Sequence, residues 1–559
     1  MRAAAPRARL LFLGALAFLW LSVLVVRLVE LQVVRHAELA GRATRQQQRT
    51  LEVTPKRGIL YDRNGRELAV SIGVDSLFAI PEDVADPAVA ARLLVPVLAL
   101  QPRALEQALR SQRSFVWVKR KLAAEEAARV RALGLAGLHF QREYKRFYPK
   151  RELAAHVLGF VGIDEDGLAG IEYALDSVIR GRSRRLVITA DGRRRWFERR
   201  THAPPEGAGV VLTLDETIQY IAEQELAAAM ARTRARSGTV IVQNPRSGEI
   251  LALANYPTYN PNNPTAVPLF RHLNRALSLA YEPGSTFKVV TIAAALEAGL
   301  ADPREIIDCQ QGSIVLAGHR IRDHKPFGRL SLREVVYESS DVGAIKVALR
   351  VGRRKLYRDI RRWKFGQRTG IELPAESPGI LRPVEKWSAV SLGALAMGQE
   401  LAVTPLQLTA ALSAIANQGV WVRPRIVREI VADTSGARLP PPHRERIITR
   451  GVAEELRRML VGVVTRGTGE QARPAGYTAA GKTGTAEKID ETGTYSATDF
   501  IASFAGFAPA HDPAVTVLVV LDTPRGEHYH GGEVAAPVFR TVVERVLAYL
   551  NVPHDQPLL

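Results

Sequence analysis

The segment Tyr281-Glu-Pro-Gly-Ser-Thr-Phe-Lys288 places a serine three residues before a lysine, at the start of an apolar run. The letters that follow, VVTIAAALEAGL over 289–300, predict a helix. Side chains three residues apart share one face of a helix, so we expect the Ser285 hydroxyl and the Lys288 amine to lie close together. The Pro-Gly pair before the serine suits a helix N-terminus, whose free N–H groups would face the hydroxyl.

Two shorter motifs follow in the chain, Ser339-Ser340-Asp341 and then Lys482-Thr483-Gly484-Thr485. A serine hydroxyl is a weak nucleophile until a neighbouring base removes its proton, and a lysine beside a second cation can be that base. We therefore expect Lys288 to act as the base and Lys482 to be the second cation.

The last motif reads as a strand, in which side chains alternate between the two faces. Lys482 and Gly484 would then share one face, and the two threonines would share the other. Gly484 would let a substrate backbone approach closely. We expect the N–H groups of Ser285 and Thr485 to form an oxyanion hole.

In this order the three motifs resemble the active-site set of the penicillin-recognising serine acyltransferases. Each motif alone is weak in a chain of this length, whereas their coincidence in suitable contexts is specific. Nearly the whole chain resembles the class B penicillin-binding proteins, D,D-transpeptidases that cross-link peptidoglycan. The further matching segments are Arg57 to Gly65 with Leu68-Ala69, Arg146 to Pro149, His156, Gly159, Gly170 to Glu172, Tyr281 to Gly284, Gly398-Gln399, Val403 to Gln407 and Gly531-Gly532.

The resemblance implies roles for the motif residues. Ser339 would relay a proton between the base and the leaving amine, and Lys482 with the neighbouring hydroxyls would hold the terminal carboxylate of a stem peptide. β-Lactams would use the same pocket by imitating D-Ala-D-Ala. No cofactor or metal is expected. The implied catalytic set is Ser285, Lys288, Ser339 and Asp341, and the implied substrate-binding set is Lys482, Thr483, Gly484 and Thr485.

Asp341 departs from the family pattern, which most often has asparagine at this position. An amide both donates and accepts hydrogen bonds, whereas an ionised carboxylate only accepts them. Aspartate does occur there in some members, notably elongation-type ones. The departure therefore bears on the subfamily more than on the activity.

The resemblance and the pattern of strands and helices together predict an α+β fold. It would have an N-terminal membrane helix, an elongated mixed α/β pedestal domain and a transpeptidase domain with an antiparallel sheet flanked by helices. The turn-rich stretch Pro204 to Gly209 marks the main boundary. We expect a cytoplasmic tail over 1–9, a transmembrane anchor over 10–29, the pedestal (dimerisation-type) domain over 30–205 and the transpeptidase domain over 206–555.

Residues Leu10 to Val26 form a run of 17 without a charge, close to the length that spans a bilayer. Arg2, Arg7 and Arg9 precede it, so the positive-inside rule keeps the N-terminus in the cytoplasm and places the rest outside. A cleaved signal peptide is the alternative, but no small-x-small cleavage site is evident after the run. We expect a single-pass protein of the cytoplasmic membrane with an extracytoplasmic catalytic domain.

The 76 basic and 57 acidic residues give a formal net charge of +19. Such a charge suits nucleic acid, an anionic membrane or an acidic substrate. No aromatic-interleaved or zinc-finger pattern accompanies the arginines, so no nucleic-acid partner is expected. Cys309 is the only cysteine, which excludes an intrachain disulfide, and we expect it to be buried. The main arginine cluster is Arg182, Arg184, Arg185, Arg193, Arg194 and Arg195.

The pedestal segments and the stretch Arg320 to His324 look most like the septal, division-specific members. The resemblance implies peptidoglycan stem peptides, a lipid-linked precursor glycan and β-lactam antibiotics as ligands. It implies a polytopic glycan polymerase and divisome membrane proteins as partners. The alternatives are an elongation-type transpeptidase, a D,D-carboxypeptidase or a non-catalytic β-lactam sensor or scaffold. A β-lactamase is disfavoured, because the three motifs supply no second base for deacylation.

Overall fold

A computed structural model describes residues 5–53, 55–181, 184–190, 196–197, 206–431, 437–438, 440–490 and 492–557. Its contacts divide the chain into two compact units, Met1–Lys56 with Gly181–Glu206, and Arg57–Arg180 with Gly207–Leu559. Several residues named above lie outside the described ranges: Arg2, Arg182, Arg193, Arg194, Arg195 and the prolines Pro204 and Pro205.

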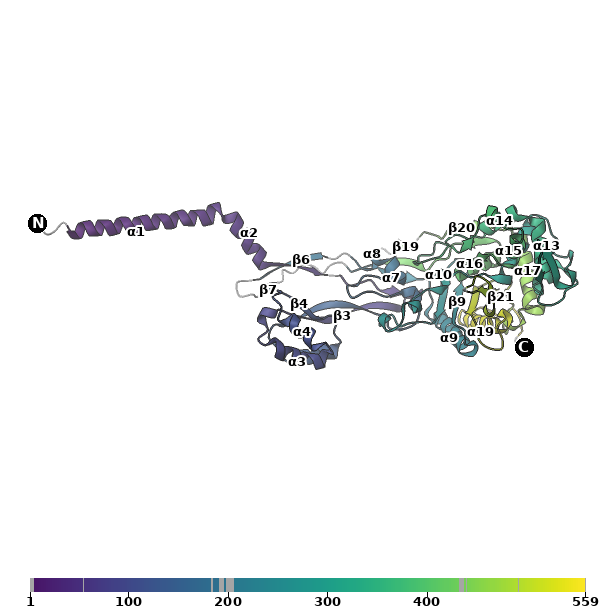
Figure 1. The fold of residues 1–559 in the computed structure, drawn as a ribbon, viewed down its shortest axis with the longest axis horizontal. Coiled ribbons are helices and arrows are strands. Elements are labelled where there is room, and N and C mark those ends of the chain that lie inside the picture. The colour runs from purple at the N-terminus through teal and green to yellow at the C-terminus, as the bar shows by residue number, and fades with distance from the viewer. Residues whose placement is uncertain are drawn as a thin grey trace. The chain divides into compact units, whose positions relative to one another are not determined.

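The first unit begins with the apolar helix α1 (Ala5–Val29), which continues through a π-helical turn, Glu30–Val34, into α2 (His36–Gln47) (Figure 1). In the described part of the chain, the stretch Ala8–Val34 is the one helix long and apolar enough to cross a membrane. The helix therefore continues beyond the uncharged run that ends at Val26. A small antiparallel sheet completes this unit, with β6 in its middle: β1 (Gln48–Val53), β6 (Arg184–Ala190) and β7 (Trp196–Phe197).

The second unit contains the predicted antiparallel sheet, which has five strands in the order β10-β9-β23-β22-β21. β21, which carries the lysine-threonine motif, is the edge strand next to β22. The bounds are β9 (Ser237–Gln243), β10 (Ile250–Tyr256), β21 (Ala480–Ile489), β22 (Tyr495–Ala508) and β23 (Val515–Asp522).

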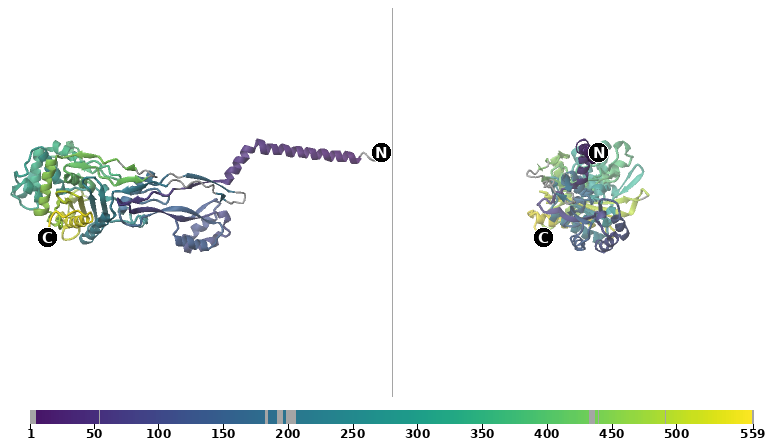
Figure 2. Two further views of the ribbon diagram at one scale, coloured as in Figure 1. Left: turned by 180° about the vertical axis from the view of Figure 1, so that it is seen from behind. Right: turned by 90° about the vertical axis from the view of Figure 1, so that its left-hand side faces the viewer.

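Helices cover both faces of this sheet because the strand side chains alternate between two apolar clusters. Val517 and Val519 of β23 pack against α9 (Glu216–Thr233) and α19 (Ala536–Tyr549). Leu518 and Val520 pack into the opposite cluster, which contains the helix that follows the candidate serine. The helices of that second cluster include α11 (Lys288–Glu297), α13 (Asp341–Val351), α16 (Pro405–Ala416) and α17 (Arg450–Arg466). Figure 2 shows the teal and green helices and the yellow C-terminal helix of the second unit from behind.

A second sheet joins strands from both sides of the predicted boundary at residue 206. Its order is β19-β18-β8-β2-β3-β4, and β5 also pairs with β3. Because β8 lies between β2 and β18, this sheet is continuous across residue 206. The domain boundary at residue 206 stays a prediction. The bounds are β2 (Leu60–Tyr61), β3 (Glu67–Ala79), β4 (Val116–Lys119), β5 (Leu138–Phe147), β8 (Gly209–Leu212), β18 (Val427–Val431) and β19 (Ala437–Arg438).

Three helices pack on the far part of β3, β4 and β5 with a hydrophobic cluster of their own. They are α3 (Pro87–Leu98), α4 (Pro102–Leu109) and α5 (Ala124–Ala132). Residues 87–109 therefore form two helices, separated at 99–101. Ala99 adopts a left-handed conformation with φ of 52° and ends the first helix, and Pro102 begins the second.

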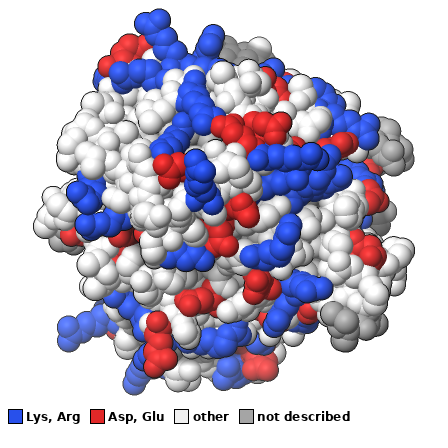
Figure 3. All heavy atoms as spheres, turned by 90° about the vertical axis from the view of Figure 1, so that its right-hand side faces the viewer, with Lys and Arg blue, Asp and Glu red and all other residues white. Residues whose placement is uncertain are grey.

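The charged surface of the second unit is mixed. On the face shown in Figure 3, lysine and arginine side chains lie among aspartate and glutamate side chains. On α14 (Arg353–Arg362), for example, Lys355 Nζ pairs with Asp359 Oδ2 at 2.8 Å. This mixture of charges is typical of a solvent-exposed surface.

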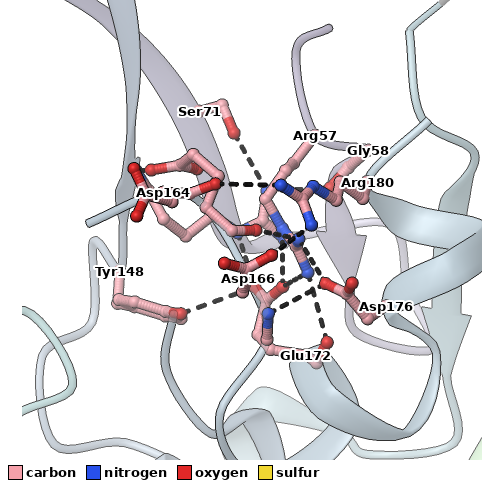
Figure 4. Close-up of polar contacts among 12 residues, drawn as sticks. Arg57, Gly58, Ser71, Tyr148, Asp164, Asp166, Glu172, Asp176 and Arg180 are labelled. Atoms are coloured by element: carbon pink, nitrogen blue, oxygen red, sulfur yellow. Dashed lines mark hydrogen bonds and ion pairs between the residues drawn. The ribbon is translucent and has the colours of Figure 1, made fainter. Parts of the chain in front are cut away.

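The segments that resemble class B pedestal signatures meet in one buried ion cluster (Figure 4). Arg57 pairs with Glu172 at 2.6 Å and with Asp176 at 2.6 Å, and Arg146 pairs with Glu172 at 2.5 Å. The side chains of Arg57, Arg146 and Glu172 are 0% exposed. The Glu172 carboxylate therefore bridges two guanidinium groups that come from segments far apart in the sequence, and Asp176 is a second partner of Arg57.

We expect Glu172→Gln to lower the unfolding midpoint strongly, because it removes the charge shared by two buried guanidinium groups. Breaking a buried ion pair costs about 3–5 kcal/mol. The matched control is Asp166→Asn, which breaks the half-exposed pair with Arg180 nearby, where the cost should stay within about 1 kcal/mol. Thermal unfolding of the two variants checks this, and equal midpoints would contradict it.

Candidate active site

The candidate nucleophile lies on a tight helical turn. Residues Gly284–Phe287 form a 3-10 turn that leads directly into α11, so Ser285 and Lys288 remain three residues apart on one helical segment. Gly284 has φ of 54°, and its N–H donates to the Gly398 carbonyl at 3.1 Å. A side chain at Gly398 would begin only 2.2 Å from the Gly284 carbonyl oxygen. Because position 398 has no side chain, its backbone can approach the Gly284 backbone closely, and this contact fixes the turn.

Lys288 is buried and points toward the second motif. Its Nζ donates to the Ser339 hydroxyl at 3.2 Å and to the Ser339 carbonyl, and it pairs with Asp341 Oδ1 at 2.8 Å. Within the described ranges, the structure has no hydrogen bond between Ser285 and Lys288. The three contacts of Lys288 match the three N–H bonds of an ammonium group.

Ser339 lies between the two lysines. Its hydroxyl accepts from Lys482 Nζ at 2.9 Å as well as from Lys288, so both lysines converge on one oxygen. Ser339 has φ of 59°, a left-handed conformation that is uncommon for a residue with a side chain. This turn presents both the hydroxyl and the carbonyl oxygen of Ser339 to the lysine side chains.

Lys482 is fully buried behind Ser339 and Thr483, and donates to the carbonyl and the hydroxyl of Thr483 at 3.3 Å each. Burial holds the pKa of Lys482 well below its usual value, and the positive charge of Lys288 lowers this pKa further. The carboxylate of Asp341 acts in the opposite direction. Protonation of Lys482 is therefore unfavourable in the free enzyme, and a bound substrate carboxylate would make it more favourable.

The two threonines of β21 face the cleft. The Thr483 hydroxyl lies 2.8 Å from that of Thr468, and the Thr485 hydroxyl accepts from the Gly531 N–H at 3.0 Å. Gly484 faces the protein interior, where a side chain would begin 2.5 Å from the Ser503 hydroxyl and 2.9 Å from Thr286. Packing of β21 against the serine turn therefore requires this glycine, and its role toward substrate stays a prediction.

The motifs meet at one cleft of about 1200 Å³. Its walls also include residues that the sequence alone did not identify, such as Glu400 and Tyr495. The Tyr495 hydroxyl donates to Glu282 at 3.1 Å, and the Glu400 N–H donates to the same carboxylate at 2.9 Å. Burial raises the pKa of Glu282. β13 (His319–Arg322), which pairs with β12 (Ser313–Leu316) in a hairpin, also lines the cleft.

A serine, two lysines and a second serine beside the edge strand of a five-stranded antiparallel sheet define the serine acyltransferase class that recognises penicillin. Two family models match: the penicillin-binding protein dimerisation domain over residues 52–212 and the penicillin-binding protein transpeptidase domain over residues 238–544. The chain therefore belongs to the class B penicillin-binding proteins.

Named relatives agree over nearly the full length. The chain is 35% identical to the probable peptidoglycan D,D-transpeptidase PenA of Neisseria gonorrhoeae, over 98% of this chain and 93% of the relative. It is 34% identical to the stage V sporulation protein D of Bacillus subtilis, over 98% and 86%. It is 31% identical to the peptidoglycan D,D-transpeptidase FtsI of Escherichia coli, over 96% and 90%.

Solved structures show the same fold. Penicillin-binding protein 3 of Mycobacterium tuberculosis, complexed with aztreonam, superposes with a TM-score of 0.71 at 30% sequence identity. The match covers 91% of this chain and 99% of the other. The predicted combination of a pedestal with a penicillin-binding transpeptidase domain is confirmed.

Proposed function

We propose that this protein is a peptidoglycan D,D-transpeptidase that cross-links stem peptides through an acyl-enzyme at Ser285. The observation that carries the proposal is the convergence of Lys288 and Lys482 on Ser339 in the cleft that Ser285 lines. The family membership supports the same chemistry. The cleft and the family also support β-lactam antibiotics as inhibitors of this site.

The reaction follows from the positions of these groups. Lys288 must first release one proton, after which its lone pair can take the proton of the Ser285 hydroxyl as that oxygen attacks the carbonyl of the penultimate D-Ala. The N–H groups of Ser285 and Thr485 would hold the developing oxyanion. As the amide bond between the two D-Ala residues breaks, Ser339 would donate its hydroxyl proton to the leaving amine and regain the proton that Lys288 took from Ser285. An acceptor amine would then attack the ester and free Ser285.

The terminal carboxylate of the donor peptide would sit at Thr483 and Thr485, which line the cleft in front of Lys482. Hydroxyl donors and an ammonium suit a carboxylate through charge-assisted hydrogen bonds. The carboxylate of a penicillin has the same needs. Substrate and inhibitor should therefore compete for this end of the cleft.

The direct test has two arms. A fluorescent penicillin should label the full chain in detergent, and mass spectrometry should place the adduct on the peptide that contains Ser285. A stem-peptide donor with an amine acceptor should then give a cross-linked product. Labelling without any turnover would favour the non-catalytic sensor or scaffold, and an adduct elsewhere would refute the proposal.

We place the activity in cell division, with a polytopic glycan polymerase and divisome proteins as partners and a lipid-linked precursor glycan as the substrate source. Support comes from the segments that resemble septal members and from the relative named FtsI. An elongation role is the alternative. A fluorescent fusion should gather at mid-cell, and a signal along the lateral wall would favour elongation instead.

We further propose that the N-terminal helix is a single anchor with its N-terminus in the cytoplasm, because arginines precede the apolar run. The catalytic domain would then be extracytoplasmic. We expect a C-terminal alkaline phosphatase fusion to be active in the periplasm. An inactive phosphatase together with an active cytoplasmic reporter at the same junction would reverse this topology.

A further inference from the structure

The turn that carries Ser339 needs an external support. Ser339 holds a left-handed conformation between α12 (Leu332–Tyr337) and α13, and such a conformation persists in a residue with a side chain only where its surroundings impose it. Lys288 contacts the carbonyl and the hydroxyl of Ser339, but it takes part in the proposed proton transfers, so a group outside the reaction must also hold the turn.

Asp323 supplies three contacts at this turn. Its Oδ1 accepts from the backbone N–H groups of Asp341 at 2.5 Å and of Val342 at 3.0 Å, and its Oδ2 accepts from the Ser340 hydroxyl at 2.8 Å. The Ser340 oxygen in turn accepts from the Gly343 N–H at 3.0 Å. The first three N–H groups of α13 are thus all bound by one carboxylate and the hydroxyl that it orients.

The support comes from a separate part of the fold. Asp323 directly follows β13 on the cleft rim, and its own N–H donates to the Gly312 carbonyl at 2.9 Å. The buried Cys309 lies 3.5 Å from the same Ser340 hydroxyl. The start of α13 is therefore tied to the β12–β13 hairpin region as well as to its own helix.

We propose that Asp323 is a positioning residue for acylation, which sets the Ser339 hydroxyl between Lys288 and Lys482. α13 buries Val342, Ile345 and Val347 completely, so its packing does not depend on the cap. Loss of the Asp323 carboxylate should instead displace the turn at Ser339, which precedes α13. A displacement of about 1 Å in a reacting group can cost about 100-fold in rate.

This inference rests on the proposed function, and its test separates the two. Acylation of the full chain by a fluorescent penicillin is measured over a range of concentrations, which gives the acylation rate constant and the apparent dissociation constant of the non-covalent complex. Wild-type protein that takes no label would refute the proposed function. Wild-type protein that is labelled provides the reference for the variants.

Asp323→Ala should lower the acylation rate constant by about 100-fold and leave the apparent dissociation constant unchanged, because the carboxylate pocket at Thr483 and Thr485 is not touched. The matched control is Ser331→Ala, which removes the N-cap bond to Glu334 of the preceding helix α12 at 3.2 Å. This control should lose thermal stability with a normal acylation rate constant. Equal rate constants in the two variants would overturn the proposal.

The Asp323→Asn variant keeps the test decisive if Asp323→Ala does not fold. Its amide oxygen can still accept from the two N–H groups of α13, whereas its NH₂ cannot accept from the Ser340 hydroxyl. We expect an acylation rate constant between those of wild type and Asp323→Ala. A wild-type rate constant in Asp323→Asn would contradict the positioning role, even if the alanine variant did not fold.

Discussion

Ser285→Ala is expected to abolish covalent labelling by penicillins and to leave the fold intact. The substitution removes the only atom that can carry the acyl group in the proposed reaction. Within the described ranges, the Ser285 hydroxyl makes no hydrogen bond, so its removal leaves no buried partner unsatisfied. The turn itself is fixed by contacts of Gly284 and Gly398 rather than by the hydroxyl. Labelling measured on a gel and unfolding measured by circular dichroism check the two halves of the expectation.

The matched control is Ser278→Ala on the nearby helix α10 (Arg275–Ser278), which removes a hydroxyl that donates to the Asn274 carbonyl at 2.7 Å. This variant should be labelled at the wild-type rate. Label that persisted on Ser285→Ala at that same rate would show that another residue is acylated. If Ser285→Ala lost both the label and the fold, Ser285→Cys would replace it as the test variant. Non-covalent binding of penicillin to Ser285→Cys would then show whether the site is intact.

Four strands of the five-stranded sheet could be predicted from the sequence because each contains a short apolar run, whereas β21 was recognised by its lysine-threonine motif. The run at 238–243 is fully buried as β9, and the alternation in β23 places successive valines and leucines in two different cores. The three motifs were also recognisable locally. A serine three residues before a lysine on a helix is a pattern within one turn.

Contacts between distant segments could not be predicted in the same way. The segments with Arg57, Arg146 and Glu172 were recognised, yet nothing in their spacing indicated that the three side chains pair in one buried cluster. Asp323 was noted only as part of a subfamily stretch, because its three acceptor contacts depend on a hairpin meeting a helix start. Ser285 and Lys288 lie on one helical segment as expected, whereas the Lys288 ammonium contacts Ser339 and Asp341.

Lys482→Met should reduce acylation by every inhibitor that carries the carboxylate of D-Ala-D-Ala, because the variant loses the ammonium behind Thr483 and Ser339. A hydrogen bond to a charged group contributes about 1.5–3 kcal/mol, which corresponds to roughly 10- to 100-fold in rate. The matched control is Lys488→Met farther along β21, where the lysine pairs with Asp522 at 2.6 Å. That control should be acylated normally.

The same variant should gain thermal stability relative to wild type, and the gain should depend on pH. Burial lowers the pKa of Lys482 in the folded protein below its usual value of 10.5, so the unfolded chain binds more protons between the two values. Wild-type stability therefore rises with pH across that window, and the cost of the buried ammonium is fully present below it. We expect the melting temperature of Lys482→Met to exceed that of wild type by more at pH 7 than at pH 10. A difference that stayed constant, or grew toward pH 10, would show that Lys482 does not carry a costly buried charge in the free enzyme. Its contribution to acylation would then come from shape alone.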